Sequence, residues 1–135
     1  MNKEFVTHNQ ALALKELGFN EPCFGFYPKS GGNIQFGSLG KFSSEYTHII
    51  SAPTYSQAFR WFREKYKLHS HISLGISDEQ DSSGLEYDEY IYVIEGLNGL
   101  DYDNYGESFF YKTYEEAESA CLDKLIEITK NKTND

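Results

Sequence analysis

Two features are missing from this chain of 135 residues: a cysteine framework and a long apolar run. Its only cysteines, Cys23 and Cys121, lie far apart and form no Cys-x-x-Cys pair, so they allow one disulfide but favour two reduced thiols in a cytosolic protein. The first residues, Met1 to Val6, lack the apolar stretch of a signal peptide, and no run is long enough to span a bilayer. The sequence therefore predicts no membrane partner and a location in the cytoplasm.

Positive charge is scarce as well. The chain has 12 Lys and Arg against 21 Asp and Glu, which gives a formal net charge of −9. Binding to nucleic acid in general depends on Lys and Arg that neutralise phosphates, so this charge argues against such a function. A basic or neutral partner is compatible with the composition, whereas an acidic partner is disfavoured.

The shortage of positive charge is most pronounced between Ile72 and Tyr111, where forty residues contain no Lys, Arg or His. Ten acids lie in this stretch, interleaved with tyrosines. Solvated loops alone explain such a charge, but acids mixed with tyrosines are also typical of a surface that binds a basic protein. We interpret residues 78–107 as a partner-binding surface whose contact residues are Asp88, Glu89, Tyr90, Asp101, Tyr102 and Asp103.

Aromatic residues are plentiful at 16%, although the mean hydropathy is only −0.58. This combination is typical of a soluble globular protein with an aromatic core and a strongly polar surface. The length fits one domain, which we place at residues 1–130, followed by a polar tail at 131–135.

Three pentapeptides predict helix starts, because each has Thr followed three residues later by Gln or Glu, the pattern of a capping box. They begin at Thr7, Thr54 and Thr113. We expect helices from Thr7 to about Leu17, closed by Gly18, from Thr54 to about Tyr66, and from Thr113 to about Lys130.

Short runs rich in aromatic and β-branched residues predict strands between these helices. We expect strands at 23–27, 34–36, 46–50, 71–76, 86–95 and 108–112, and turns at 29–33 and 98–106. In the run Tyr90–Ile94 the odd and the even positions, which face opposite sides of a strand, are all aromatic or β-branched. We therefore expect this strand to be central in its sheet and covered on both faces. The predicted fold is a single compact α+β domain, with a mainly antiparallel sheet packed by about three helices.

The second helix suggests an alternative function, the sequestration of a small anionic ligand such as a nucleotide. Arg60 and Arg63 lie on one stripe with Lys67, and Trp61 is the only tryptophan. Bidentate guanidinium contacts together with a stacking ring would suit a nucleotide. The competing interpretation is a solvated cationic face beside a half-buried tryptophan, and we favour it.

A second alternative is a metal site. His69 and His71 would share one face of a strand, and His48 on a neighbouring strand would complete a three-histidine set. We favour a structural role for these residues, because no acid or cysteine lies close to them in sequence. The segment 101–106 begins like a calcium loop but has Tyr105 at the fifth ligand position and Lys112 at the twelfth. No catalytic signature is present, so the sequence predicts neither an enzyme nor a cofactor.

Three segments, 11–23, 51–66 and 113–127, resemble a family of short uncharacterised proteins encoded by tailed bacteriophages and by bacteria, notably Bacteroidetes. The most specific part is Ser51-Ala52-Pro53-Thr54-Tyr55-Ser56-Gln57-Ala58-Phe59-Arg60-Trp61-Phe62-Arg63-Glu64-Lys65-Tyr66. The resemblance implies an origin in a phage or mobile element and a location in the bacterial cytoplasm. It implies no activity, and small phage proteins of this kind often act by binding a host component.

Overall fold

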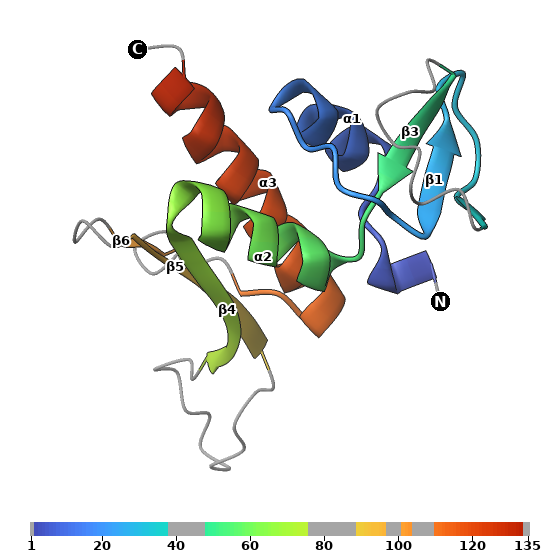
Figure 1. Cartoon of the computed structure of the whole chain (residues 1–135). Helices are drawn as coiled ribbons and strands as arrows, with labels where there is room; N and C mark the ends of the chain where they lie inside the picture. The colour runs from blue at the N-terminus through green and yellow to red at the C-terminus, as the bar shows by residue number, and fades with distance from the viewer. Residues whose placement is uncertain (1, 38–47, 76–88, 97–100, 104–109, 134–135) are drawn as a thin grey trace.

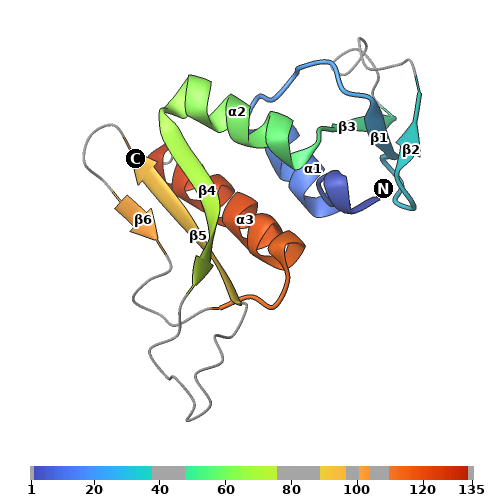
Figure 2. The same ribbon diagram turned by 90° about the horizontal axis from the view of Figure 1, so that it is seen from below.

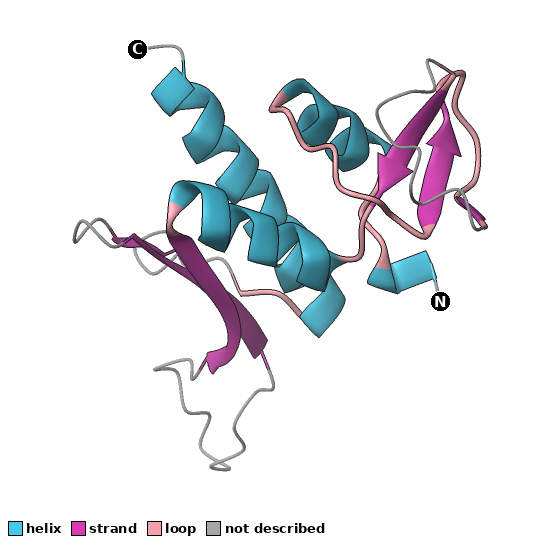
Figure 3. Ribbon diagram, viewed as in Figure 1, coloured by secondary structure: helices cyan, strands magenta, loops and turns pink. Residues whose placement is uncertain are grey.

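A computed structural model describes residues 2–37, 48–75, 89–96, 101–103 and 110–133 of the chain. The elements in chain order are η1 (Asn2–Glu4), α1 (His8–Glu16), β1 (Gly25–Pro28), β2 (Gln35–Phe36), β3 (Ile49–Ala52), α2 (Tyr55–Tyr66), β4 (Leu68–Gly75), β5 (Glu89–Gly96), β6 (Asp101–Asp103) and α3 (Tyr114–Thr133). The predicted α+β class is confirmed, and the helices separate the two groups of strands (Figures 1 and 3). Helix α3 continues to Thr133, beyond the predicted end near Lys130.

Helix α1 begins and ends as its sequence predicts. The Thr7 hydroxyl accepts from the Gln10 backbone N–H at 3.2 Å, and the Gln10 side chain accepts from the Thr7 N–H at 3.0 Å, so the capping box is complete. At the other end Gly18 has φ +100° and its N–H donates to the Lys15 carbonyl, while the N–H of Phe19 donates to the Leu14 carbonyl. These two bonds form a Schellman motif that satisfies the last carbonyls of the helix.

The other two threonines also cap their helices. The Thr54 hydroxyl accepts from the Gln57 N–H at 3.2 Å, and the Thr113 hydroxyl accepts from the Glu116 N–H at 3.1 Å. The amide nitrogen of the Gln57 side chain donates to the Glu21 carboxylate and the Pro22 carbonyl. Gln57 therefore ties the start of α2 to the segment that connects α1 with β1.

The strands form two separate three-stranded antiparallel sheets instead of the single sheet predicted. Their strand orders are β2-β1-β3 and β4-β5-β6. Strand β5 is central, as predicted, and pairs with β4 over eight residues, from Leu68 opposite Gly96 to Gly75 opposite Glu89. Helix α3 packs on β5 and β4, and α1 packs on β3 (Figure 2).

Several local predictions around the second sheet are wrong. Residues 101–103, predicted as a turn, form strand β6, which pairs with the second half of β5. Tyr111, predicted within a last strand, forms only an isolated bridge with Tyr90. Among the described residues the two faces of β5 differ, because Tyr92 and Ile94 are buried whereas Ile91 and Val93 are only half-buried. The predictions for 38–47, 76–88, 97–100 and 104–109 lie outside the described residues.

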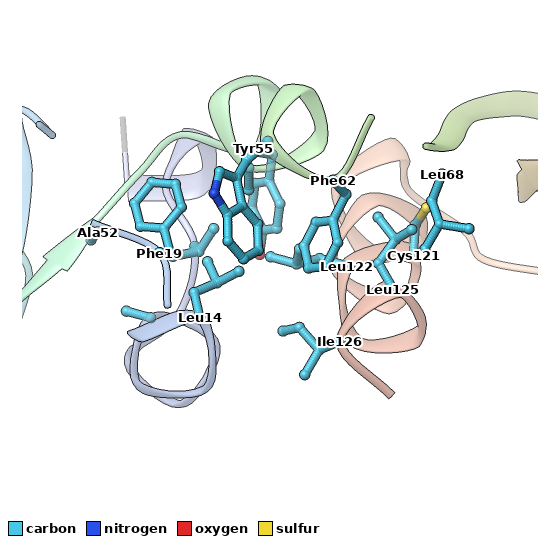
Figure 4. Close-up of a cluster of buried hydrophobic side chains, with 14 of the residues drawn as sticks. Leu14, Phe19, Ala52, Tyr55, Phe62, Leu68, Cys121, Leu122, Leu125 and Ile126 are labelled. Carbon is cyan, nitrogen blue, oxygen red and sulfur yellow. The ribbon is translucent and has the colours of Figure 1, made fainter. Parts of the chain in front are cut away.

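One cluster of buried side chains joins the helices and both sheets. It includes Ile50 and Ala52 of β3, Phe62 of α2, and Tyr92 and Ile94 of β5. Figure 4 shows side chains of α1, α2 and α3 converging in its middle. Within the described chain, no helix is both long and apolar enough to cross a membrane.

Candidate partner-binding surface

The acidic residues predicted to bind a partner lie on strands β5 and β6, with the exception of Asp88, which is outside the described residues. Glu89 and Tyr90 begin β5, whereas Asp101, Tyr102 and Asp103 make up β6. The register aligns β6 with the far end of β5, from Val93 opposite Asp103 to Glu95 opposite Asp101. The structure therefore divides the predicted residues between the two ends of β5.

Tyr90 belongs to the structural part of this region. Its backbone N–H and carbonyl both bond to Tyr111, at 2.8 Å and 2.9 Å. Its ring meets the ring of Tyr114, at the start of α3, edge to face at 6.0 Å. Tyr90 consequently ties the start of β5 to the segment that leads into α3, and it is half-buried.

At the other end of β5, Glu95 lies on the face of the strand that is turned away from the helices. Tyr92 and Ile94 are buried against the helices, so Val93 and Glu95 occupy the opposite face, since successive positions of a strand alternate. In the backbone register Asp103 is paired with Val93 and Asp101 with Glu95. Glu95 is exposed and was missing from the predicted contact residues. The alternation of the run Tyr92–Glu95 was the signal that would have included it.

Two of the three predicted histidine ligands also lie on this outer face. His69 stands opposite Glu95 and His71 opposite Val93, and both histidines are exposed. His48 is far from them in the fold, because it precedes β3 and its carbonyl accepts from the Lys29 N–H next to β1 in the other sheet. The predicted three-histidine set is therefore not assembled. Within the described residues, no group of three His, Cys, Asp or Glu side chains is placed to hold a metal ion.

The predicted nucleotide contacts on α2 face different environments. Arg60 and Arg63 are exposed, and Arg60 lies 3.7 Å from the Glu21 carboxylate. Trp61 is only 6% exposed and lies edge to face with Phe19 at 5.4 Å between ring centroids. The structure thus separates the ring from the two guanidinium groups, because Trp61 belongs to the core.

The neighbours of Trp61 explain why it is unavailable for stacking. Its ring also packs edge to face on Phe62 at 5.0 Å and on Tyr66 at 5.4 Å. The Lys65 ammonium lies 4.9 Å from its centroid, in the geometry of a cation–π interaction. These groups occupy the surroundings that a stacking base would need.

Neither cysteine is placed to act as a nucleophile. Burial raises the pKa of Cys23 to about 12, with a further contribution from the Glu21 carboxylate. Burial likewise raises the pKa of Cys121 to about 12. Because the thiolate is the reactive form, the raised pKa values disfavour reaction of either thiol at neutral pH. Cys121 behaves as the small buried apolar residue that the helix pattern predicts.

Comparisons with known proteins do not assign the chain to a family. No family model matches it, and searches of curated proteins and of solved structures give no significant match. The described geometry defines an α+β protein with three helices and two small antiparallel sheets.

Proposed function

We propose that this protein is a noncatalytic accessory protein that binds a basic protein partner through the outer face of β5 and β6. The observation that supports this proposal is the register, which pairs Asp101 with exposed Glu95 and Asp103 with Val93. We call these three residues the acidic face. No Lys or Arg occurs in β4, β5 or β6, so the sheet itself offers no neutralising charge.

The distribution of positive charge on α2 supports the same proposal. Arg60, Arg63 and Lys65 lie in this helix, whereas Lys67 directly precedes Leu68, which is opposite Gly96, and so lies at the end of the sheet that carries Glu95. The ion pairs found in the described chain, Arg60 with Glu21 and Lys124 with Glu127, lie outside the second sheet. An acidic face without internal counter-charges would steer a basic partner toward it and hold the complex by charge pairs.

The resemblance of the helices to short phage and bacterial proteins suggests the setting for this function. We propose that the protein acts in a bacterial cell and that its partner is a protein of the phage or of the host.

Capture from a bacterial lysate tests the proposal, with tagged protein immobilised at low salt. We expect a basic partner to be retained at about 50 mM salt and released by about 500 mM, because screening shortens the reach of exposed charges. The charge-reversed variant Glu95→Lys/Asp101→Lys should lose at least about 90% of the captured partner, consistent with the loss of rim charges that control association.

A matched reversal supplies the control. Glu16→Lys/Glu64→Lys changes the net charge by the same amount but alters exposed residues of α1 and α2. It should retain the partner at the wild-type level. Equal capture by both reversed variants would refute the acidic face as the binding surface, and equal loss would show that net charge alone controls binding.

A further inference from the structure

Strand β4 presents an unusually long open edge. The outer strands of the two sheets are β2, β3, β4 and β6. Strand β4 has eight residues, whereas β2 has two, β3 has four and β6 has three. In the described chain β4 pairs only with β5, so its other edge carries no strand. An unpaired edge offers backbone N–H and carbonyl groups to another extended chain.

The usual means of blocking such an edge are missing from β4. Its sequence, Leu-His-Ser-His-Ile-Ser-Leu-Gly, has no Pro, Lys, Arg, Asp or Glu. Its register with β5 advances one residue at a time along the full length, so no bulge bends it. Short length and charge protect the other outer strands, as in Asp101-Tyr102-Asp103 of β6. The edge of β4 is therefore more open to pairing with another strand than the edges of the other outer strands.

We propose that β4 pairs with β4 of a second copy of this chain, antiparallel and centred on His71. A second copy is favoured because this pairing places buried Leu68 opposite the exposed Leu74 of the other copy, on the same face of the sheet. It also places His69 opposite Ser73 and Ser70 opposite Ile72. The two sheets then form one continuous six-stranded sheet with a two-fold axis, as is usual for a homodimer.

The exposure of individual side chains agrees with this register. Leu74 is 62% exposed although Leu68, its symmetric counterpart, is 1% exposed. Both leucines are at helix-facing positions of β4. The pairing therefore places Leu74 of one copy beside Leu68 of the other copy, at the edge of that copy's core. The burial of Leu74 is the apolar contribution that a single copy does not supply.

The charge distribution permits the pairing despite a net charge of −9 on each copy. No acid occurs between Lys65 and Gly75, and the acidic strand β6 is at the opposite edge of the sheet. The acidic faces of the two copies remain available, so the dimer is compatible with the proposed function but does not depend on it.

Cysteine cross-linking tests both the dimer and its centre. A residue on the two-fold axis faces its own copy at a Cα separation of about 4.5–5.5 Å, within the range for a disulfide. We therefore expect His71→Cys to give a covalent dimer of 31 kDa, twice the 15.5 kDa chain, when diamide takes up the two electrons and two protons of the paired thiols. Cys23 and Cys121 are buried and do not compete.

Ser56→Cys is the matched control, because Ser56 is exposed on α2 and far from the proposed axis. At about 50 μM protein we expect at least tenfold more covalent dimer from His71→Cys than from Ser56→Cys. Equal cross-linking of the two variants would overturn the proposed pairing.

Sedimentation of the unmodified chain supplies an independent measurement. We expect a reversible dimer at about 100 μM and a monomer for His71→Lys, in which two ammonium groups face each other on the axis. Far-UV circular dichroism would verify that His71→Lys is folded. A wild-type chain that remains monomeric, or a folded His71→Lys variant that still dimerises, would contradict the proposal.

Discussion

At the scale of single residues, Gln10 is the most connected polar group of the core. Its side chain is 3% exposed, and its carbonyl oxygen accepts from the Thr7 N–H at 3.0 Å and from the Tyr55 hydroxyl at 2.9 Å. Its amide nitrogen lies 3.1 Å from both the carbonyl and the hydroxyl oxygen of Ser119, and 3.0 Å from the Asp123 carboxylate. One side chain thus joins α1, α2 and α3, a role that the capping pattern alone does not indicate.

Gln10→Met should lower the free energy of unfolding by about 2–3 kcal/mol, because it keeps the volume but leaves the Tyr55 hydroxyl and the Thr7 N–H without their acceptor. Urea unfolding of the variant measures this loss. Asn9→Met, on the exposed side of the same helix, should change stability by less than about 0.5 kcal/mol. Equal stabilities of the two variants would show that the Gln10 bonds contribute nothing net.

Glu118 makes the stability of the fold depend on pH. Burial, followed by the charge of Glu115, raises its pKa from 4.5 to about 7. The folded state therefore holds a proton that the unfolded chain releases at lower pH, so this group costs stability as the pH rises from about 4.5 to 7.

Glu118→Gln removes that cost. We expect the free energy of unfolding of the variant to exceed that of the wild type by up to about 1 kcal/mol at pH 8 and by almost nothing near pH 4. The expected gain is kept small because Glu118 is only half-buried, and solvent screens its charge. Chemical unfolding at both pH values measures the difference. Glu64→Gln on the exposed face of α2 is the control, and a gain for Glu118→Gln that is equal at both pH values would contradict the assignment.

At the scale of secondary structure, the end of α2 carries local backbone strain. Lys67 caps this helix at φ 58° and ψ 32°, and it is the non-glycine residue with positive φ in the described chain. Its N–H donates to the Phe62 carbonyl, and buried Leu68 begins β4 directly afterwards. The abrupt change from helix to strand imposes a left-handed conformation that disfavours a residue with a Cβ.

Lys67→Gly should therefore raise the free energy of unfolding by about 0.5–1 kcal/mol, the relief of the left-handed conformation less the added freedom of glycine in the unfolded chain. Lys67→Ala is the matched control, because it removes the same charge but keeps the Cβ. Thermal unfolding of both variants isolates the backbone effect as the difference between them. A glycine variant no more stable than the alanine variant would rule out strain at this position.

The helices were predictable because their signals are local. Thr7, Thr54 and Thr113 all cap the helices that their capping-box patterns predict. Strand β6 was missed because Asp and Asn favour turns, and only pairing with β5 makes these residues extended. The sequence favoured a half-buried Trp61, and its full burial was not predictable for a similar reason, since its partner Phe19 comes from another segment. Surface sites depend on such long-range contacts, so the pairing that brings β6 beside Glu95 was not predictable from the sequence.

At the scale of the whole molecule, the two sheets share a core although no strand connects them. Ile50 of β3 is 1% exposed and Ile94 of β5 is 0% exposed, and both belong to one cluster with Phe62 of α2. Helix α3 contacts α1, α2, β4 and β5 and so links the two halves. We expect the chain to unfold in one cooperative step, with the same urea midpoint for Trp61 fluorescence and for circular dichroism.

Paired core substitutions make this expectation specific. Ile50→Val and Ile94→Val should each cost about 0.5–1.5 kcal/mol, because each removes a buried methyl group from one sheet. In a cooperative unit each variant lowers the fluorescence midpoint and the circular dichroism midpoint together, although Trp61 lies far along the chain from Ile94. Arg60→Ala, an exposed change on α2, should leave both midpoints within about 0.5 kcal/mol of the wild type. If Ile94→Val lowered the circular dichroism midpoint and left the Trp61 midpoint unchanged, the second sheet would unfold independently, and the shared cluster would not couple the two halves.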